Sequence, residues 1–170
     1  HLMNLHAVEV YAAGQHATLQ RWLTAVDTTK DINQKAPVLL LHYAKSIFAH
    51  GKNKETLELF EKLEPIFREA NNIEHLVNLL VNKGILLSYI GDYQQAMQQG
   101  KETLAILKEH SIDNFYTHQA ERLIGVCACL LGDEHEGLDW LNRAAAGVRQ
   151  LLNTNKEIRI SHELVQTLAD

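Results

Sequence analysis

The sequence has little of what interrupts helices or cross-links a chain. It contains only two prolines, nine glycines and 6% aromatic residues among 170 residues. This scarcity, with abundant Leu, Ala, Gln and Glu, favours helix over sheet. It also has only two cysteines, Cys127 and Cys129, which excludes a disulfide framework and is typical of a reducing compartment.

Long apolar runs and basic runs are both missing. No apolar run is long enough to span a bilayer, and no signal peptide is visible. The net charge is −5, and without concentrated Lys and Arg the chain is not expected to contact nucleic acid directly. We therefore expect a cytoplasmic protein that avoids membranes. With 46% hydrophobic residues, the chain can bury a core as a single domain over residues 1–170.

The motifs of catalysis and metal binding are missing too. There is no phosphate loop and no Gly-x-Ser-x-Gly motif. The ten histidines include no His-x-x-x-His pair. On a helix, Cys127 and Cys129 would diverge by about 200°, so they cannot chelate one ion from one helix. We expect no enzyme, no cofactor and no metal, and we interpret the cysteines as buried structural thiols, with a metal or redox role as the alternative.

A repeated helix–turn–helix unit is the main feature that is present. Gly14, Gly51, Gly91 and Gly132 each lie between two amphipathic segments, at spacings of 37, 40 and 41 residues. The predicted helices lie near 2–13, 16–26, 36–50, 54–70, 73–90, 93–110, 115–131, 134–153 and 157–169. They define repeats over 2–35, 36–72, 73–113 and 114–154, followed by an unpaired helix at 157–169. Because that last helix has no partner, we expect the chain to be a fragment of a longer protein.

Several helix ends can be predicted from single residues. Asp92 and Asp133 follow turn glycines and are expected to cap second helices, and Asn71 is expected to cap the next first helix. Pro65 lies inside a predicted helix, where proline removes a hydrogen bond and clashes with the preceding turn. We therefore expect a kink or break near Lys62–Pro65.

The third repeat carries a family resemblance. Gly91, Asp92, Tyr93 and Ala96, with Gly84 seven residues before the turn, resemble the tetratricopeptide repeat (TPR). In that family, small residues on both helices let the helices pack closely. The fourth repeat has small residues at the matching positions: Gly125, Gly132 and Gly137. The resemblance covers essentially the whole chain and implies an all-α, right-handed solenoid of about four hairpins and a terminal helix.

The length of the repeat points to one variant of this family. The usual TPR has about 34 residues, and a longer variant occurs in the effector-binding region of maltose-activator-like (MalT-like) bacterial transcription regulators. The chain resembles that region through Gly14, Leu19, Trp22, Leu23 and Pro37. The resemblance implies a sensor segment of a transcription regulator. The nucleotide-binding and DNA-binding domains of such a regulator would lie outside this chain.

The resemblance also implies where a partner would bind. In TPR proteins the first helices of the hairpins line the concave face. Counting back from the turn glycines gives the predicted ligand- or partner-binding residues: Tyr11, Lys45, Phe48, Asn78, Asn82, Tyr89, Gln119 and Arg122. Asn78 and Asn82, flanked by Lys45 and Arg122, are suited to hold a carboxylate or a peptide backbone. The alternative is that these residues form a solvated face or contacts between repeats.

The sequence thus favours binding without catalysis. The leading hypothesis is a regulator segment whose groove senses a small-molecule or protein effector. The alternative is a generic TPR scaffold that binds a peptide or a partner helix. Trp22 and Trp140 are interpreted as packing residues, with a partner interface as the alternative, and self-association stays open.

Overall fold

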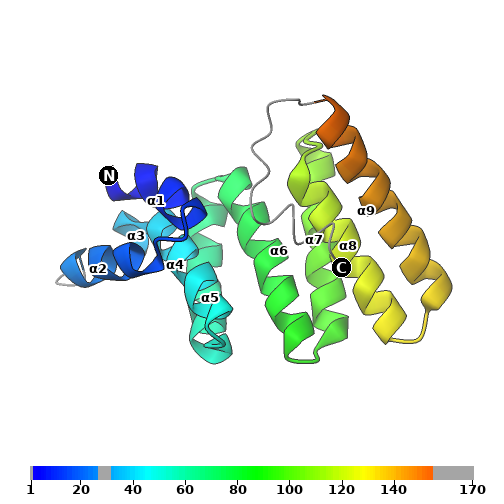
Figure 1. The fold of residues 1–170 in the computed structure, drawn as a ribbon, viewed down its shortest axis with the longest axis horizontal. Coiled ribbons are helices and arrows are strands. Elements are labelled where there is room, and N and C mark those ends of the chain that lie inside the picture. Colours follow the sequence, from blue (N-terminus) through cyan, green and yellow to red (C-terminus); the bar gives the residue numbers. More distant parts are fainter. Residues whose placement is uncertain (1, 27–31, 155–170) are drawn as a thin grey trace. The chain divides into compact units, whose positions relative to one another are not determined.

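The computed structural model describes residues 2–26 and 32–154, and all regular structure within these ranges is α-helical (Figure 1). The helices are α1 Leu2–Ala12, α2 His16–Val26, α3 Ile32–Lys35, α4 Pro37–Ala49, α5 Asn53–Glu69, α6 Ile73–Tyr89, α7 Tyr93–Glu109, α8 Phe115–Leu130 and α9 Glu134–Thr154. The all-α prediction is confirmed, and the eight predicted helices in these ranges begin and end within one residue of the observed bounds. The short helix α3 was not predicted, and the predicted helix at 157–169 lies outside the described residues.

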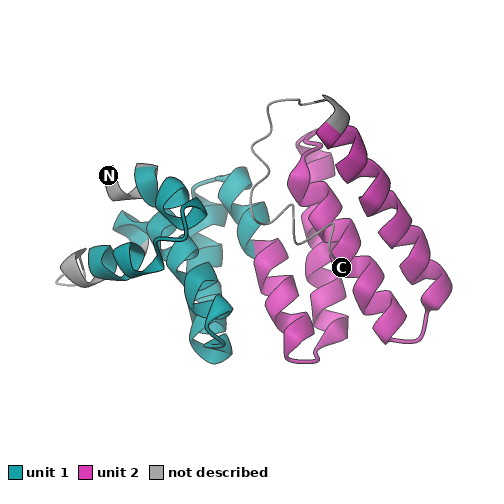
Figure 2. Ribbon diagram, viewed as in Figure 1, with its two compact units in different colours: residues 1–79 teal, residues 80–170 magenta. Residues whose placement is uncertain are grey.

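The chain divides into two compact units, residues 1–79 and 80–170 (Figure 2). In unit 1, α4 packs against α1, α2, α3 and α5. In unit 2, α8 packs against both α7 and α9. The boundary falls within α6, and the single domain over residues 1–170 stays a prediction. Within the described ranges, no helix is both long and apolar enough to cross a membrane.

The turns inside the hairpins share one backbone geometry. At the third turn, the amide of Gly91 donates to the carbonyl of Ser88 (3.2 Å) and the amide of Asp92 donates to that of Leu87 (2.9 Å). This pair of bonds is a Schellman motif, which needs a left-handed residue just after the helix. The predicted turn glycines all have positive φ, at 68°, 75°, 89° and 95° for Gly14, Gly51, Gly91 and Gly132.

The two turns between hairpins that lie in the described ranges use the same geometry without glycine. Asn71 and Ser111 take the left-handed position, with φ of 49° and 53°. The predicted cap at Asn71 is therefore wrong: the Oδ1 atom of Asn72 accepts from the backbone N–H of His75 instead (3.3 Å). Because the turn requires a left-handed residue at position 71, the capping position moves one residue along the chain.

The predicted caps of two second helices are confirmed. The Oδ1 atom of Asp92 accepts from the backbone N–H of Gln95 at 3.1 Å. The Oδ1 atom of Asp133 accepts from the backbone N–H of Glu136 at 3.0 Å. Each carboxylate satisfies a backbone donor that has no partner within its own helix.

The predicted break at Pro65 is wrong, because α5 continues through it from Asn53 to Glu69, and a kink within the continuous helix stays a prediction. Leu63 and Phe67, on either side of the proline, are 0% and 1% exposed. Burying two such side chains contributes about 3–6 kcal/mol, which offsets a helix-interior proline cost of about 3 kcal/mol. Tertiary packing therefore overrides the local rule.

Glycines bring the helices of unit 2 into close contact, as the resemblance implied. A Cβ added at Gly125 would lie 2.8 Å from the carbonyl oxygen of Gly137 and 3.0 Å from the amide nitrogen of Leu141. A Cβ added at Gly100 would lie 2.8 Å from the Cγ1 atom of Ile124. Since real Cβ atoms do not approach other atoms so closely, α7, α8 and α9 can pack in this way only around glycine.

Candidate functional site

All of the predicted binding residues lie on first helices of hairpins: Tyr11 on α1, Lys45 and Phe48 on α4, Asn78, Asn82 and Tyr89 on α6, and Gln119 and Arg122 on α8. Their exposure differs widely. Lys45, Asn78 and Gln119 are buried, at 5%, 6% and 8% exposed, whereas Tyr89 is 75% exposed. The other four are half-buried. The helices are as predicted, and the binding role of these residues stays a prediction.

The structure brings two of the predicted residues together across helices of unit 1. The Nζ atom of Lys45 lies 4.6 Å from the ring centroid of Tyr11, a cation–π contact. The ring of His42 lies 5.2 Å from the same Tyr11 ring. Since Lys45 is buried, its ammonium group faces this ring in the interior of unit 1, where it supports the packing of α4 on α1.

Histidines extend this contact into a cluster. The His16 ring lies 5.7 Å from the Tyr11 ring. His42 is 4% exposed, and neither of its ring nitrogens has a hydrogen-bond partner among the residues that the structure describes. Burial, followed by the charges of Lys45 and His75, lowers the pKa of His42 to about 3. The ring is therefore neutral at physiological pH, and a second buried positive charge beside Lys45 is avoided.

Two further histidines of unit 1, His50 and His75, pack their rings against other aromatic rings. The Nδ1 atom of His50 lies 2.8 Å from the carbonyl oxygen of Ser46, and the His50 ring meets the His16 ring edge-on at 5.9 Å. His75 stacks on Phe67 with ring centroids 5.6 Å apart. Over the described ranges, no group of three or more His, Cys, Asp or Glu side chains could hold a metal ion.

The two cysteines have different environments. Cys127 is 0% exposed and lies in a core cluster with Leu87, Ala96 and Leu123. Burial raises the pKa of its thiol to about 11, so little reactive thiolate forms near neutral pH. Cys129 is half-buried, so the prediction of a fully buried thiol is correct for Cys127 only.

In unit 2, α6 and α8 meet close to two predicted residues. A Cβ added at Gly84 would collide with the side chain of Leu123, and Leu87 and Leu123 share one core cluster. Asn82 and Arg122 lie two and one residues before these contact points, so contacting helix segments carry them. The amide of Asn82 offers a donor and an acceptor, and the guanidinium group of Arg122 offers donors, and each can match a peptide backbone or a carboxylate.

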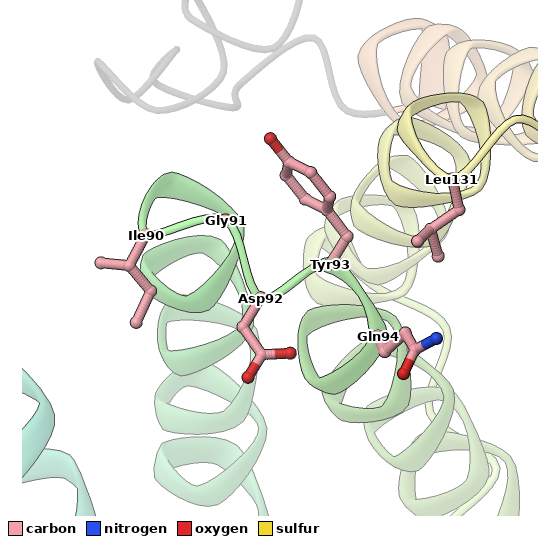
Figure 3. A pocket seen from close by; sticks show the side chains of 6 residues that line it. All are labelled: Ile90, Gly91, Asp92, Tyr93, Gln94 and Leu131. Carbon is pink, nitrogen blue, oxygen red and sulfur yellow. The ribbon is translucent and has the colours of Figure 1, made fainter.

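A surface hollow lies at a turn rather than on a first-helix face. It has a volume of about 470 Å³ and is lined by Ile90, Gly91, Asp92, Tyr93, Gln94 and Leu131 (Figure 3). This hollow was not predicted from the sequence. The sequence nevertheless contains a feature that could have indicated it. Large apolar residues directly precede Gly91 and Gly132, whereas Ala-Ala and Ala-His precede the other two turn glycines.

Comparison with known proteins agrees with this architecture. Residues 36–109, which contain α4 to α7, match the family described as tetratricopeptide repeat. The curated protein sequences compared with the chain include no match. Among solved structures, the chain is similar to the TPR domain of Arabidopsis FLU, with 20% sequence identity and a TM-score of 0.62 over 65% of this chain and 92% of that one. Residues 36–109 thus have the sequence pattern of tetratricopeptide repeats, and the chain has the all-α fold of a TPR helical-repeat solenoid.

Proposed function

We propose that this chain is a protein-interaction module that binds a peptide or a partner helix through its first helices and catalyses no reaction. The observation that carries the proposal is the pairing of a TPR fold with Asn82 and Arg122 on contacting segments of α6 and α8. Both side chains are half-buried. A partner can therefore reach them, while the surrounding helices limit their conformational freedom before binding.

Tyr89 adds an apolar contact to this polar pair. It is the last residue of α6 and is 75% exposed. Exposed aromatic residues are enriched at interface hot spots because they bury a large area and lose little conformational entropy. Hydrogen bonds from Asn82 and Arg122 would fix the partner's backbone, and Tyr89 would cover one of its apolar side chains.

A peptide selection tests the proposal. Random 12-residue peptides displayed on phage would be selected on the wild-type chain, and their affinities measured by calorimetry. We expect the double variant Asn82→Ala, Arg122→Ala to lose about tenfold or more in affinity, because each lost hydrogen bond to a charged group costs about 1.5–3 kcal/mol. The control is Glu109→Ala, an exposed change on α7. If the selected peptides bind the double variant as tightly as the wild type, the proposal is wrong.

A narrower form of the proposal makes the chain the effector-sensing segment of a MalT-like bacterial transcription regulator, with a small molecule or a protein as effector. It is supported by the sequence pattern around α2. In the structure Leu19 and Leu23 are buried, at 0% and 8% exposed, and Trp22 is half-buried, so that pattern also serves packing. Nucleotide-binding and DNA-binding domains on either side of this segment in its gene would support the regulator, and their absence would refute it.

A further inference from the structure

We propose a second interaction surface on unit 2, which binds a protein segment that combines apolar residues with Lys or Arg. The surface consists of residues 90–94 and 130–136, and we call it the turn edge. It includes the turn that joins α6 to α7 and the turn that joins α8 to α9. Because it contains neither Asn82 nor Arg122, it does not depend on the function proposed above.

The turn edge exposes large apolar side chains. Ile90, Leu130 and Leu131 are 50%, 55% and 44% exposed. Ile90 and Leu131 contribute to the hollow, in which Tyr93 stands between the Gly91 turn and the end of α8 (Figure 3). Covering the part of these side chains that is still exposed to water would favour binding.

The fold of the turns does not require these apolar residues. Ile90 and Leu131 each occupy the position directly before a left-handed glycine. In unit 1 the same position holds Ala13 and His50, and the Schellman bonds there have the same pattern. Since the turn forms with alanine or histidine, a large exposed aliphatic residue is free to serve another role.

The turn edge is acidic as well as apolar. Residues 90–94 and 130–136 contain four carboxylates, Asp92, Asp133, Glu134 and Glu136, and no Lys or Arg. The wider segments 84–100 and 123–142 also contain no Lys or Arg and add Asp139. His135 also lies in the turn edge, and its Nδ1 atom lies 3.7 Å from the Oδ2 atom of Asp139. A hollow with this charge favours cationic groups placed around an apolar anchor.

The charge also decides between classes of partner. A second copy that docks through its own turn edge would bring the same carboxylates face to face, and like charges across an interface weaken binding. Phosphate groups of nucleic acids or acidic lipids would be repelled for the same reason. A protein segment with Leu- or Ile-type residues flanked by Lys or Arg satisfies both properties of the surface.

The test uses two synthetic 18-residue helical peptides, one built of Leu and Lys and the other of Leu and Glu in the same pattern. Each would be titrated into the ¹⁵N-labelled chain at about 0.15 M salt, where charges are screened beyond about 8 Å. We expect the Leu/Lys peptide to shift the amide signals of residues 90–94 and 130–136, and the Leu/Glu peptide to leave them in place.

Variants sharpen the test. Leu131→Ser and Glu134→Lys each change an exposed residue of the turn edge whose side chain makes no capping hydrogen bond; Leu131 caps α8 through its backbone N–H, which serine keeps. Each variant should weaken Leu/Lys binding about tenfold. Glu109→Lys is the matched charge control at the far end of α7 and should keep full affinity. Asn82→Ala with Arg122→Ala should also keep it, which separates this surface from the one proposed above.

Three outcomes would overturn the proposal. The Leu/Lys peptide could leave the turn edge unshifted, or Glu109→Lys could weaken binding as much as Glu134→Lys, which would indicate non-specific charge attraction. The same amides could also shift with the concentration of the chain alone, which would assign the surface to a second copy.

Discussion

Unit 1 and unit 2 fill their interiors in different ways. Unit 1 places polar rings and a charge between α1 and α4, where Tyr11 contacts both His42 and Lys45. Unit 2 brings backbones together, so that Gly125 and Gly137 face each other without side chains between α8 and α9. The comparison teaches that helices of one repeat type can pack either through side chains that titrate, as between the neighbouring hairpins of unit 1, or through the absence of side chains, as within the α8–α9 hairpin of unit 2. We expect the first kind of contact to be weakened by protonation at low pH, and the second kind to be weakened when a glycine is replaced by a larger residue.

The turns differ in a parallel way. The backbone geometry is shared, yet Ala13 and His50 precede the turn glycines of unit 1, whereas Ile90 and Leu131 precede those of unit 2. A shared backbone with different side chains means that the backbone sets the turn and the side chains are free to vary. The apolar and acidic turns of unit 2 are therefore the better candidates for binding.

The largest effect is expected from filling a glycine contact in unit 2. In Gly125→Leu, the new side chain meets the backbone of α9, which cannot move aside as a flexible side chain can, so α8 and α9 must separate. We expect a loss of about 3 kcal/mol in the free energy of unfolding, the upper end for overpacking. Urea denaturation would measure the loss, and hydrogen exchange should show it in the amides of α8 and α9.

Ala146→Leu is the matched control, since it adds similar bulk at an exposed position of α9. It should change the free energy of unfolding by no more than about 0.5 kcal/mol. Equal stability of Gly125→Leu and the wild type would show that the close approach of the two helices is not needed for the fold.

A smaller effect is expected from acid, and in unit 1. The folded-state pKa of His42 is lowered to about 3 from 6.5, so between these values the unfolded chain binds a proton that the folded chain does not. The free energy of unfolding therefore has its full value above about pH 6.5. Below that pH it decreases by about 1.4 kcal/mol for each unit by which the pH is lowered. By pH 5 the loss should reach about 2 kcal/mol. The pKa of His75 is also lowered by burial and adds a loss in the same direction.

His42→Leu isolates this contribution, because leucine keeps an apolar group in the buried site and removes two ring nitrogens without partners among the described residues. We expect the variant to lose less stability than the wild type between pH 7 and pH 5. The exposed His110→Leu change should leave the pH dependence as it is. Urea denaturation at the two pH values measures the difference, and identical pH slopes for His42→Leu and wild type would contradict the assignment.

The smallest effect compares matching helix caps in the two units. Lys52 and Asp92 have nearly the same backbone angles, with φ and ψ of −83° and 57° against −86° and 69°, but only Asp92 provides a side-chain cap. Asp92→Ala should destabilise unit 2 by about 1 kcal/mol. Lys52→Asp should stabilise unit 1 by somewhat less than 1 kcal/mol, because it also removes an exposed ion pair between Lys52 and Glu55 (3.5 Å) that is worth at most about 1 kcal/mol.

Thermal unfolding with amide exchange in α5 and α7 would measure both changes. Opposite signs for the two variants are expected. If Lys52→Asp also destabilised the chain, the shared backbone geometry would not be enough to create a cap.

Much of the local structure was predictable from the sequence. Glycine spacing and helical periodicity gave the helix bounds, and an Asp after a turn glycine predicted a cap at Asp92 and Asp133. Asn71 was predicted less well, because either Asn71 or Asn72 can cap and only the turn geometry selects between them. The predicted break at Pro65 does not occur, because the free energy gained by burying Leu63 and Phe67 outweighs the cost of a proline inside the helix.

The candidate binding residues were less predictable. Repeat register placed all eight on first helices, but it could not give their exposure. Lys45 and Asn78 are nearly as buried as the core, and Tyr89 projects into solvent. Exposure depends on which neighbouring helices cover each face, and a sequence pattern within one helix does not contain that information.

The sequence by itself thus determined where the eight longer helices of the described ranges begin and end, since left-handed glycines and apolar periodicity act over a few residues, but it did not predict the short helix α3. Only the tertiary structure decided which side chains meet. It placed Lys45 over Tyr11, surrounded His42 with apolar and cationic groups, and left Ile90 and Leu131 at the surface beside a hollow. The physical reason is that burial and pKa depend on contacts between residues far apart in the chain, which local propensities do not specify.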